Sequence, residues 1–267
     1  MKAYISVFKM RLNNGLQYRA AALAGIGTQF FFGFIFIMIF EAFYAHAAAP
    51  PEMTLSEVIT YTWLKQAFLA FVVLWLRDNE LFQLITSGNI AYELCRPNGL
   101  YGLWYAKLLA QRISSALLRC FPILIVTIFL PEPYRLKLPP DLPSLLLFLA
   151  VLIAGLLMLV AISMLIYISV FVTMSPAGSL LLFSVFGEFF AGLVIPVPLM
   201  PDWMQKIVYV LPFHWTADFP FRVFTGNIGI EEASTGLLIQ LVWLAALIAL
   251  GYFTMKKALR RIVVQGG

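Results

Sequence analysis

FSVFGEFFAGLVIPVPLMPDWMQKIVYVLPFHWTADFPFRVFTG, residues 183–226, is an apolar run that prolines interrupt. It begins as an apolar helix with one carboxylate, Glu188, near its middle. The interruptions are Pro196, Pro198 and Pro201, and an amphipathic turn led by Trp203 follows them. Broken helices persist in a membrane only where protein or a water-filled cavity covers the freed backbone groups. The run therefore predicts a membrane-spanning helix followed by an outer re-entrant or interfacial hairpin, as in transport proteins.

The composition places the chain among integral membrane proteins. Of its 267 residues, 62% are hydrophobic and only 12% are charged, with a mean hydropathy of +0.90. Soluble domains carry about 25% charged residues. The net charge of +5 does not indicate a nucleic-acid partner, because the basic residues flank apolar runs and form no patch. We expect one all-α membrane domain over residues 1–267, in contact with lipid.

Six membrane-spanning helices are expected from apolar runs of about 20 residues. Their ranges are 20–43, 58–76, 112–130, 144–172, 178–196 and 235–255. The fourth is longer than one bilayer thickness requires, which predicts a tilted or projecting helix. The first is expected to be a retained helix, because its apolar run exceeds the roughly 7–15 residues of a cleaved signal peptide.

Basic residues indicate the orientation, because cytoplasmic loops carry an excess of lysine and arginine. With the N-terminus inside, thirteen of the 18 basic residues fall on inner segments or inner span ends: Lys2, Lys9, Arg11, Arg19, Arg77, Arg96, Lys107, Arg112, Arg119, Lys256, Lys257, Arg260 and Arg261. Both termini are therefore expected in the cytoplasm. Ile5, Phe8 and Leu12 share one face of the leader, which is either an interfacial helix or a solvated segment.

The longest inner loop, RDNELFQLITSGNIAYELCRPNGLYGLWYAKLLAQR, covers residues 77–112. An apolar stripe with acids before it predicts a short amphipathic helix. Ser87-Gly88-Asn89 is expected to end or bend this helix, and Arg96-Pro97-Asn98-Gly99 predicts a turn. Such a helix beneath the bilayer is either a docking surface for a cytoplasmic partner or a simple connection.

Three polar residues fall inside expected spans: Lys65, Gln66 and Glu188. A charge at mid-bilayer costs roughly 2.5–3.5 kcal/mol on insertion scales and usually faces the bundle interior or a wet cavity. Lys65 and Glu188 have similar expected depths, so an ion pair between them is one hypothesis, with either a structural or a substrate-binding role. Arg112 and Arg119 could extend to the inner interface. Aromatic residues crowd the hairpin and are expected to be mostly interface anchors: Trp203, Tyr209, Phe213, Trp215, Phe219, Phe221 and Phe224.

Motifs of common enzymes are missing from the sequence. It contains no G-x-x-x-x-G-K-[ST] phosphate-binding motif and no H-E-x-x-H zinc motif. The two histidines, His46 and His214, have no nearby cluster of ligands. We therefore expect no ATP-binding, metal-binding or catalytic site in this chain.

These features together resemble the membrane-spanning subunit of ABC type-2 permeases, over nearly the whole chain. RDNELFQLITSGNIAYELCRPNGL resembles the coupling segment of that family. GEFFAGLVIPVPLMPDWMQKIVYVLPF resembles its fifth-span signature, and DFPFRVFTGNIG its segment before the sixth span. The likeness is strongest to a bacterial subgroup whose members pair with a second, different permease.

The resemblance implies an exporter subunit that does not itself bind or hydrolyse ATP. In that family, two permeases pack side by side and each contacts an ATPase through the coupling helix; ATP and Mg²⁺ are bound by that ATPase. Carried onto this chain, the docking residues are Arg77, Asp78, Glu80, Leu81, Leu84, Glu93 and Arg96. The translocation path between subunits is bordered by the second and fifth spans, with Lys65, Gln66 and Glu188. The resemblance also implies a bacterial plasma membrane location.

Two other functions remain open from the sequence. An ion-coupled secondary transporter would use Lys65 and Glu188, although the chain shows no internal repeat of the kind many such transporters have. A non-transport protein would use its spans only to scaffold a partner. The substrate is left open, as is pairing with a second copy, although the subgroup favours a different permease.

Overall fold

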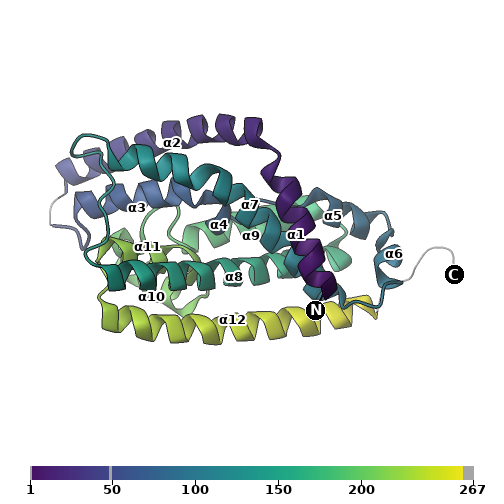
Figure 1. Ribbon diagram of the computed structural model, residues 1–267. Helices are drawn as coiled ribbons and strands as arrows, with labels where there is room; N and C mark the ends of the chain where they lie inside the picture. The colour runs from purple at the N-terminus through teal and green to yellow at the C-terminus, as the bar shows by residue number, and fades with distance from the viewer. Residues whose placement is uncertain (1, 48–49, 261–267) are drawn as a thin grey trace.

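The computed structural model describes residues 2–47 and 50–260, and within them it contains helices and loops but no strand (Figure 1). The helices are α1 Lys2–Leu16, α2 Arg19–Ala45, α3 Leu55–Ala67, α4 Leu69–Val72, α5 Asn79–Thr86, α6 Ile90–Leu94, α7 Leu100–Ile128, α8 Leu142–Thr173, α9 Pro176–Phe190, α10 Asp202–Val210, α11 Asp218–Thr225 and α12 Ile230–Leu259. Two 3₁₀ turns, Val197–Leu199 and His214–Thr216, flank α10. Arg261, assigned above to the inner side, lies outside the described residues. The all-α prediction is confirmed for the described residues.

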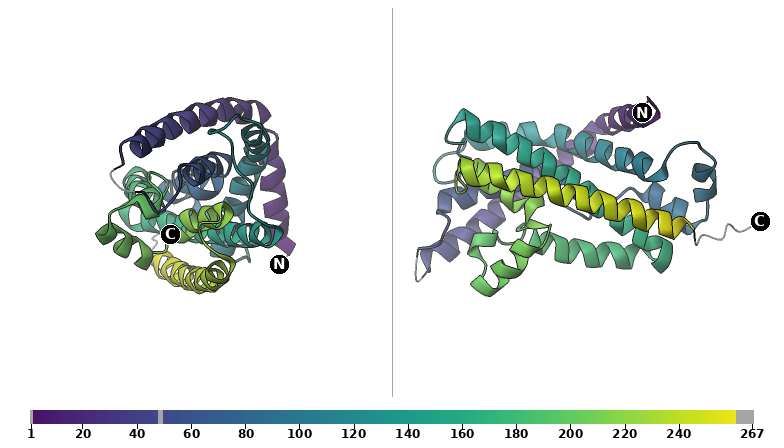
Figure 2. Two further views of the ribbon diagram at one scale, coloured as in Figure 1. Left: turned by 90° about the vertical axis from the view of Figure 1, so that its left-hand side faces the viewer. Right: turned by 90° about the horizontal axis from the view of Figure 1, so that it is seen from below.

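Helix α8 runs through the centre of the bundle. It is apolar on every face, and most of its central turns are buried, which is the pattern of a helix surrounded by others. Helix α12 packs along it over most of their length. Seen end-on, α2 and α12 lie on opposite sides of the bundle (Figure 2). Gln240 of α12 donates to the carbonyl oxygens of Val151 at 3.1 Å and Trp215 at 2.7 Å, which fixes α12 against α8.

Four of the described helices are long and apolar enough to cross a membrane: α2, α7, α8 and α12. Three of them contain the predicted spans 20–43, 144–172 and 235–255, and α8, with 32 residues, is the long span that the sequence predicts. Helix α7 begins at Leu100, well before the predicted start at residue 112, because the apolar and aromatic residues after the turn at 96–99 continue the helix. The chain is a multi-pass membrane protein.

The second and fifth predicted spans, 58–76 and 178–196, do not form long helices. Helix α3 ends at Ala67, the single turn α4 follows, and Val73 is already extended with φ −87° and ψ 142°. Helix α9 has 15 residues and ends at Phe190. Side chains from neighbouring helices bind the carbonyl groups that these breaks release, so the chain tolerates them. Continuous helices over 58–76 and 178–196 were therefore a wrong expectation.

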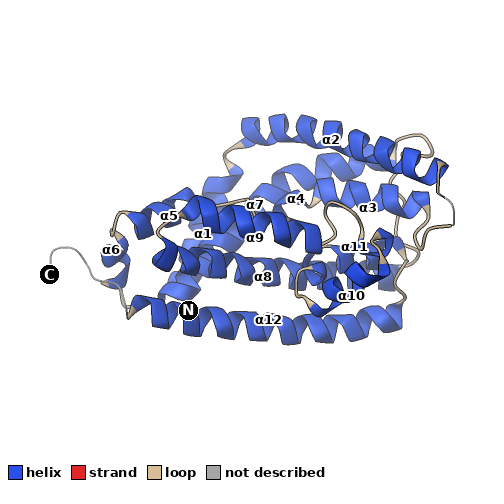
Figure 3. Cartoon of the chain, turned by 180° about the vertical axis from the view of Figure 1, so that it is seen from behind, coloured by secondary structure: helices blue, strands red, loops and turns tan. Residues whose placement is uncertain are grey.

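The bundle has two distinct ends. Helices α5 and α6 form one end, toward which α12 runs, and α11 with the loops around it forms the other (Figure 1). The view from behind shows α9 along the bundle, with α10 and α11 beyond it toward the far end (Figure 3). A hydrophobic cluster fills each half. Tyr61, Trp63 and Phe221 belong to the cluster at the α11 end, and Leu81 and Trp104 to the cluster at the α5–α6 end.

Candidate functional site: a polar cavity beside the broken helix

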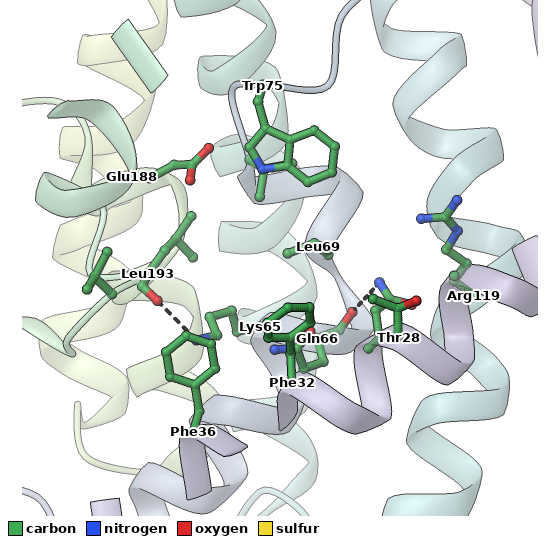
Figure 4. Close-up of a pocket in the computed structure, with 14 residues that line it drawn as sticks. Thr28, Phe32, Phe36, Lys65, Gln66, Leu69, Trp75, Arg119, Glu188 and Leu193 are labelled. Carbon is green, nitrogen blue, oxygen red and sulfur yellow. Dashed lines mark hydrogen bonds between the residues drawn. The ribbon is translucent and has the colours of Figure 1, made fainter. Parts of the chain in front are cut away.

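A cavity of about 470 Å³ lies beside the break between α3 and α4. Residues of α2, α3, α4, α7 and α9 and of the segments after α4 and α9 surround it (Figure 4). Its apolar lining includes Phe32, Phe36, Leu69 and Trp75. Its polar lining is Thr28, Gln29, Lys65, Gln66, Arg119 and Glu188. All three in-span polar residues singled out from the sequence therefore line one cavity, in a bundle whose interior is otherwise mostly apolar.

The break itself is held by two side chains from other helices. Arg112 of α7 donates to the carbonyl oxygens of Ala70 at 3.0 Å and Val73 at 2.7 Å. Gln29 of α2 donates through Nε2 to the carbonyl oxygen of Gln66 at 2.9 Å. Because α4 ends at Val72, the carbonyls of Ala70 and Val73 lie where the helical pattern stops, and leaving one buried without a hydrogen bond costs about 1–3 kcal/mol. The break between α3 and α4 is thus stabilised by specific hydrogen bonds from α7 and α2.

Lys65 is 5% exposed and is bound to protein groups. Its Nζ donates to the carbonyl oxygen of Leu193 at 3.0 Å, in the segment that follows α9. The same ammonium group lies 3.4 Å from the centre of the Phe36 ring, which is a cation–π contact. Lys65 therefore ties α3 to the end of α9.

Glu188 makes no ion pair with Lys65 in the described structure, although both line the cavity. Its carboxylate turns toward the segment after α4, near the backbone amides of Leu74 and Trp75 (Figure 4). Its Oε1 atom is buried without a hydrogen-bond partner among the described residues. The hypothesis of a direct Lys65–Glu188 pair does not match this arrangement. The Lys65 ammonium group contacts the Leu193 carbonyl and the Phe36 ring instead.

Arg119 reaches the cavity through space left by a glycine. A Cβ atom built on Gly25 of α2 would lie 2.9 Å from Cζ of Arg119. The guanidinium group thus packs directly on the α2 backbone, and its Nε is buried without a partner among the described residues. Gln29 lies one turn further along α2 and also faces the cavity.

Sequence reasoning missed part of this site. The expectation that Arg112 extends to the interface was wrong, since Arg112 is 1% exposed and binds backbone carbonyls. Arg119, Gln29 and Trp75 were not assigned to the path. The signal for Gln29 was present, because Gly25, Gln29, Phe32 and Phe36 recur at helical spacing on one face of α2.

The α5–α6 end forms as its sequence predicts. Asp78 caps α5 by accepting from the backbone amides of Glu80 at 2.9 Å and Leu81 at 3.4 Å. Helix α5 ends at Thr86, before Ser87-Gly88-Asn89. Of the residues assigned to docking, Arg77, Glu80 and Arg96 are exposed and Leu84 is half-buried. Asp78, Leu81 and Glu93 are buried and hold the segment together.

Charged groups fasten this end to two other helices. Arg11 of α1 is hydrogen-bonded to Glu80 and lies 3.6 Å from Asp78. Glu93 accepts from Lys107 Nζ at 3.0 Å and from Trp104 Nε1 at 2.8 Å, both on α7. Burial by itself would raise the pKa of the Glu93 carboxyl, but these hydrogen bonds, with the charges of Lys107 and Arg96, hold that pKa below its usual range. Helix α1 is thus a folded element that packs against α7, although none of its residues is buried.

The predicted hairpin after α9 is a chain of short helices. Pro196 and Pro198 are buried around the first 3₁₀ turn, and Pro201 precedes α10, on which Trp203 is 62% exposed. Tyr209 is exposed as well, which suits an interface anchor. Phe219, Phe221 and Phe224 are buried in the bundle, so the anchor expectation was wrong for these three. They lie on α11, where the face toward α3 and α8 is apolar.

Comparison with known proteins gave one result. A family model described as ABC-2 family transporter protein matches residues 30–266 of the chain. The match covers the whole cavity apart from its first residues on α2, and it includes the complete α5–α6 segment. No curated protein and no solved structure gave a significant match.

Proposed function

Because the chain belongs to the ABC-2 transporter family, we propose that it is the permease subunit of an ATP-driven exporter. It docks a separate ATPase through the segment 77–98 and forms the translocation path with a second permease, a different chain. ATP and Mg²⁺ are bound by the ATPase. The α5–α6 end and both termini face the cytoplasm of a bacterial cell.

The observation that carries this proposal is the surface of α5 and α6. At one end of the bundle this surface exposes two cations, Arg77 and Arg96, and one carboxylate, Glu80. The apolar side chain of Leu84, which is half-buried, lies on the same surface. Tyr92, with 75% of its side chain exposed, adds an aromatic group beside them. Interfaces are enriched in tyrosine and arginine, so this composition suits a protein contact.

The same surface is attached firmly to the bundle. The rings of Phe82 and Tyr167 stack with centroids 4.3 Å apart, which joins α5 to α8. The Tyr167 hydroxyl accepts from the Asp78 amide at 2.6 Å. Through Arg11 and Glu93, the surface is also joined to α1 and α7. Movement of a docked ATPase would therefore pass directly to membrane helices.

The position of the broken helix favours a translocation path that passes through the cavity. Lys65, Gln66 and Glu188 line a hollow between the interrupted α3–α4 and α9, so polar groups that are costly in a membrane gather where the helix is broken. Export is the direction in the permeases that the sequence resembles.

Affinity purification of the tagged chain from its native host, in mild detergent, tests this function. Mass spectrometry should find an ABC ATPase and a second permease, and the sample should hydrolyse ATP. The double variant Leu84→Asp with Arg96→Glu should lose the ATPase, whereas Trp203→Ala, at the far end, should retain it. A chain that purifies alone and works only with a proton gradient would instead be the ion-coupled transporter.

A further inference from the structure

A second cavity, of about 480 Å³, lies where the chain enters its first membrane helix. Its walls are the end of α1, the start of α2, the segment that opens α5 and one face of α7. Helix α2 is a candidate span that begins at Arg19, and the exposed Tyr18 lines the cavity just before it (Figure 1). Tyrosine is enriched at the boundary between membrane and water. The cavity therefore lies at the level of lipid head groups.

The two acids of this cavity are already bound to protein groups. Glu80 is hydrogen-bonded to Arg11, which also lies 3.6 Å from Asp78. Asp78 in addition accepts from the first amides of α5. Three arginines against these two acids leave the lining with a net positive charge.

Two of the three arginines are available to a ligand. Among the described residues, the side chains of Arg77 and Arg119 make neither an ion pair nor a hydrogen bond. Arg77 is exposed, and Gln111 of α7 fixes its backbone by donating to its carbonyl oxygen at 3.1 Å. Arg119 is half-buried, and of its nitrogens only Nε is buried without a partner, so the terminal nitrogens remain accessible. Guanidinium groups match the oxygens of a phosphate group in pairs.

Uncharged polar side chains lie beside these cations. Asn14, Asn79 and Ser115 line the cavity, and none of their side chains is hydrogen-bonded within the part of the chain that the structure describes. Amide and hydroxyl groups can donate to phosphate oxygens and can also bind hydroxyl groups of a ligand. The lining thus suits a phosphate ester that carries further oxygen atoms.

Apolar surface continues from the cavity along the membrane helices. Leu118 of α7 lines the cavity, and the exposed Phe121 follows three residues later on the same side of the helix. Leu23 is exposed on α2, which packs beside α7. A ligand whose phosphate lies in the cavity can therefore place hydrocarbon chains along α2 and α7. This surface favours a lipid over a soluble phosphate compound.

We propose that this cavity binds the head group of an anionic phospholipid, with its phosphate on Arg77 and Arg119 and its acyl chains along α2 and α7. Basic pockets between membrane helices bind such head groups in other proteins. Arg77 directly precedes Asp78, the cap of α5, so the bound lipid holds the start of the 77–98 segment at the membrane surface. The inference goes beyond the proposed function, because it depends on neither an ATPase nor a transported compound.

Competition binding on the full chain, purified in uncharged maltoside detergent, tests the inference. The probe is a phosphatidylglycerol with a fluorophore on one acyl chain, and fluorescence anisotropy measures its binding. Unlabelled phosphatidylglycerol should compete about tenfold better than phosphatidylcholine of the same chain length, because choline cancels the charge that the arginines bind. Equal competition by the two lipids would overturn the inference. Glycerol 3-phosphate should compete poorly, and competition as strong as that of the lipid would assign the cavity to a soluble phosphate compound instead.

Removal of the two cations separates the site from general attraction to a basic protein. The double variant Arg77→Gln with Arg119→Gln should weaken phosphatidylglycerol about tenfold and leave phosphatidylcholine unchanged. The matched control, Lys257→Gln with Arg260→Gln, removes two exposed cations from the end of α12, on the opposite side of the bundle from α2 (Figure 2). It should change neither affinity. Equal losses in the two double variants would contradict a specific site.

A second pair of variants keeps every charge in place. Asn14→Trp puts an indole ring into the lining from the exposed side of α1 and should weaken phosphatidylglycerol, whereas Asn13→Trp, exposed but outside the cavity, should not. Thermal unfolding shows whether each variant is folded. An unchanged affinity for phosphatidylglycerol in Asn14→Trp and in the arginine double variant, with Tm as in the wild type, would overturn the inference.

Discussion

Arg112 Nη1 lies 2.7 Å from the carbonyl oxygen of Val73, on the segment where the α3–α4 region becomes extended. Its second terminal nitrogen donates to Ser163 Oγ of α8 at 3.0 Å. One buried guanidinium group thus joins α7, the broken helix and α8. The charge is compensated by carbonyl and hydroxyl dipoles, because no carboxylate is paired with it in the described structure.

Replacing Arg112 by methionine should destabilise the protein strongly. The variant leaves the carbonyl groups of Ala70 and Val73 buried without donors, at a cost of about 3 kcal/mol. Thermal unfolding of the purified chain in detergent measures the effect as a fall in Tm. Arg77→Met, an exposed arginine nearby, is the control and should leave Tm almost unchanged. An equal Tm for both variants would show that Arg112 does not hold the break.

Two glycines on α2 should respond in opposite ways to alanine. A Cβ atom on Gly33 would overlap the indole ring of Trp63, whereas a Cβ on Gly27 meets nothing within 4 Å. Gly33→Ala should therefore cost about 1–3 kcal/mol by overpacking. Gly27→Ala should raise stability by up to about 1 kcal/mol, because alanine favours the helix. Unfolding midpoints in detergent compare the two, and a stabilising Gly33→Ala would refute the close α2–α3 packing.

Lys107 and Glu93 should be coupled energetically. Lys107→Met removes the ammonium group and leaves a buried carboxylate, at a cost of about 3 kcal/mol. The double variant Lys107→Met with Glu93→Gln should lose less unfolding free energy than the sum of the losses in the two single variants. A double-mutant cycle of unfolding free energies measures the coupling, expected at about 1–3 kcal/mol. Additive losses would mean that the two side chains act independently.

Stability should also depend on pH through Glu93. The pKa of its carboxyl in the folded protein is below the ordinary value of 4.5. The contribution of the Glu93 carboxylate to the free energy of unfolding is therefore fully present above pH 4.5. It is lost as the pH falls through the pKa of this group in the folded protein. Wild type should exceed Glu93→Gln in Tm near pH 7, and the difference should shrink below pH 4.5. A difference that stays constant down to pH 3 would contradict this.

How far sequence predicts this fold depends on the range of the interactions involved. Helices α2, α8 and α12 follow from long apolar runs, and the end of α5 follows from Ser87-Gly88-Asn89, because these signals are local. The break after α3 could not be predicted, since residues 58–76 contain no proline or glycine. The groups that stabilise the break come from Arg112 and Gln29, on other helices.

The candidate site was predictable in outline only. Charges inside apolar runs identified Lys65, Gln66 and Glu188, because such residues are costly in a membrane. Arg119 was assigned by its position near a span end, and only the packing of its guanidinium group on Gly25 places it in the cavity. Similarly, Asp78 and Glu93 carry charges that suggest a docking surface, but both are buried by partners distant in sequence.

Cross-linking from Cys95 tests the central claim most directly. Cys95 is a free, exposed cysteine at the end of α6, beside Arg96, whereas Cys120 is buried. In the complex purified from the native host, a short bifunctional maleimide should join Cys95 to an ABC ATPase, and Cys95→Ser should abolish the product. If the ATPase co-purifies but Cys95 forms no cross-link and reacts with maleimide as fast as in the isolated chain, the α5–α6 surface is not its docking site.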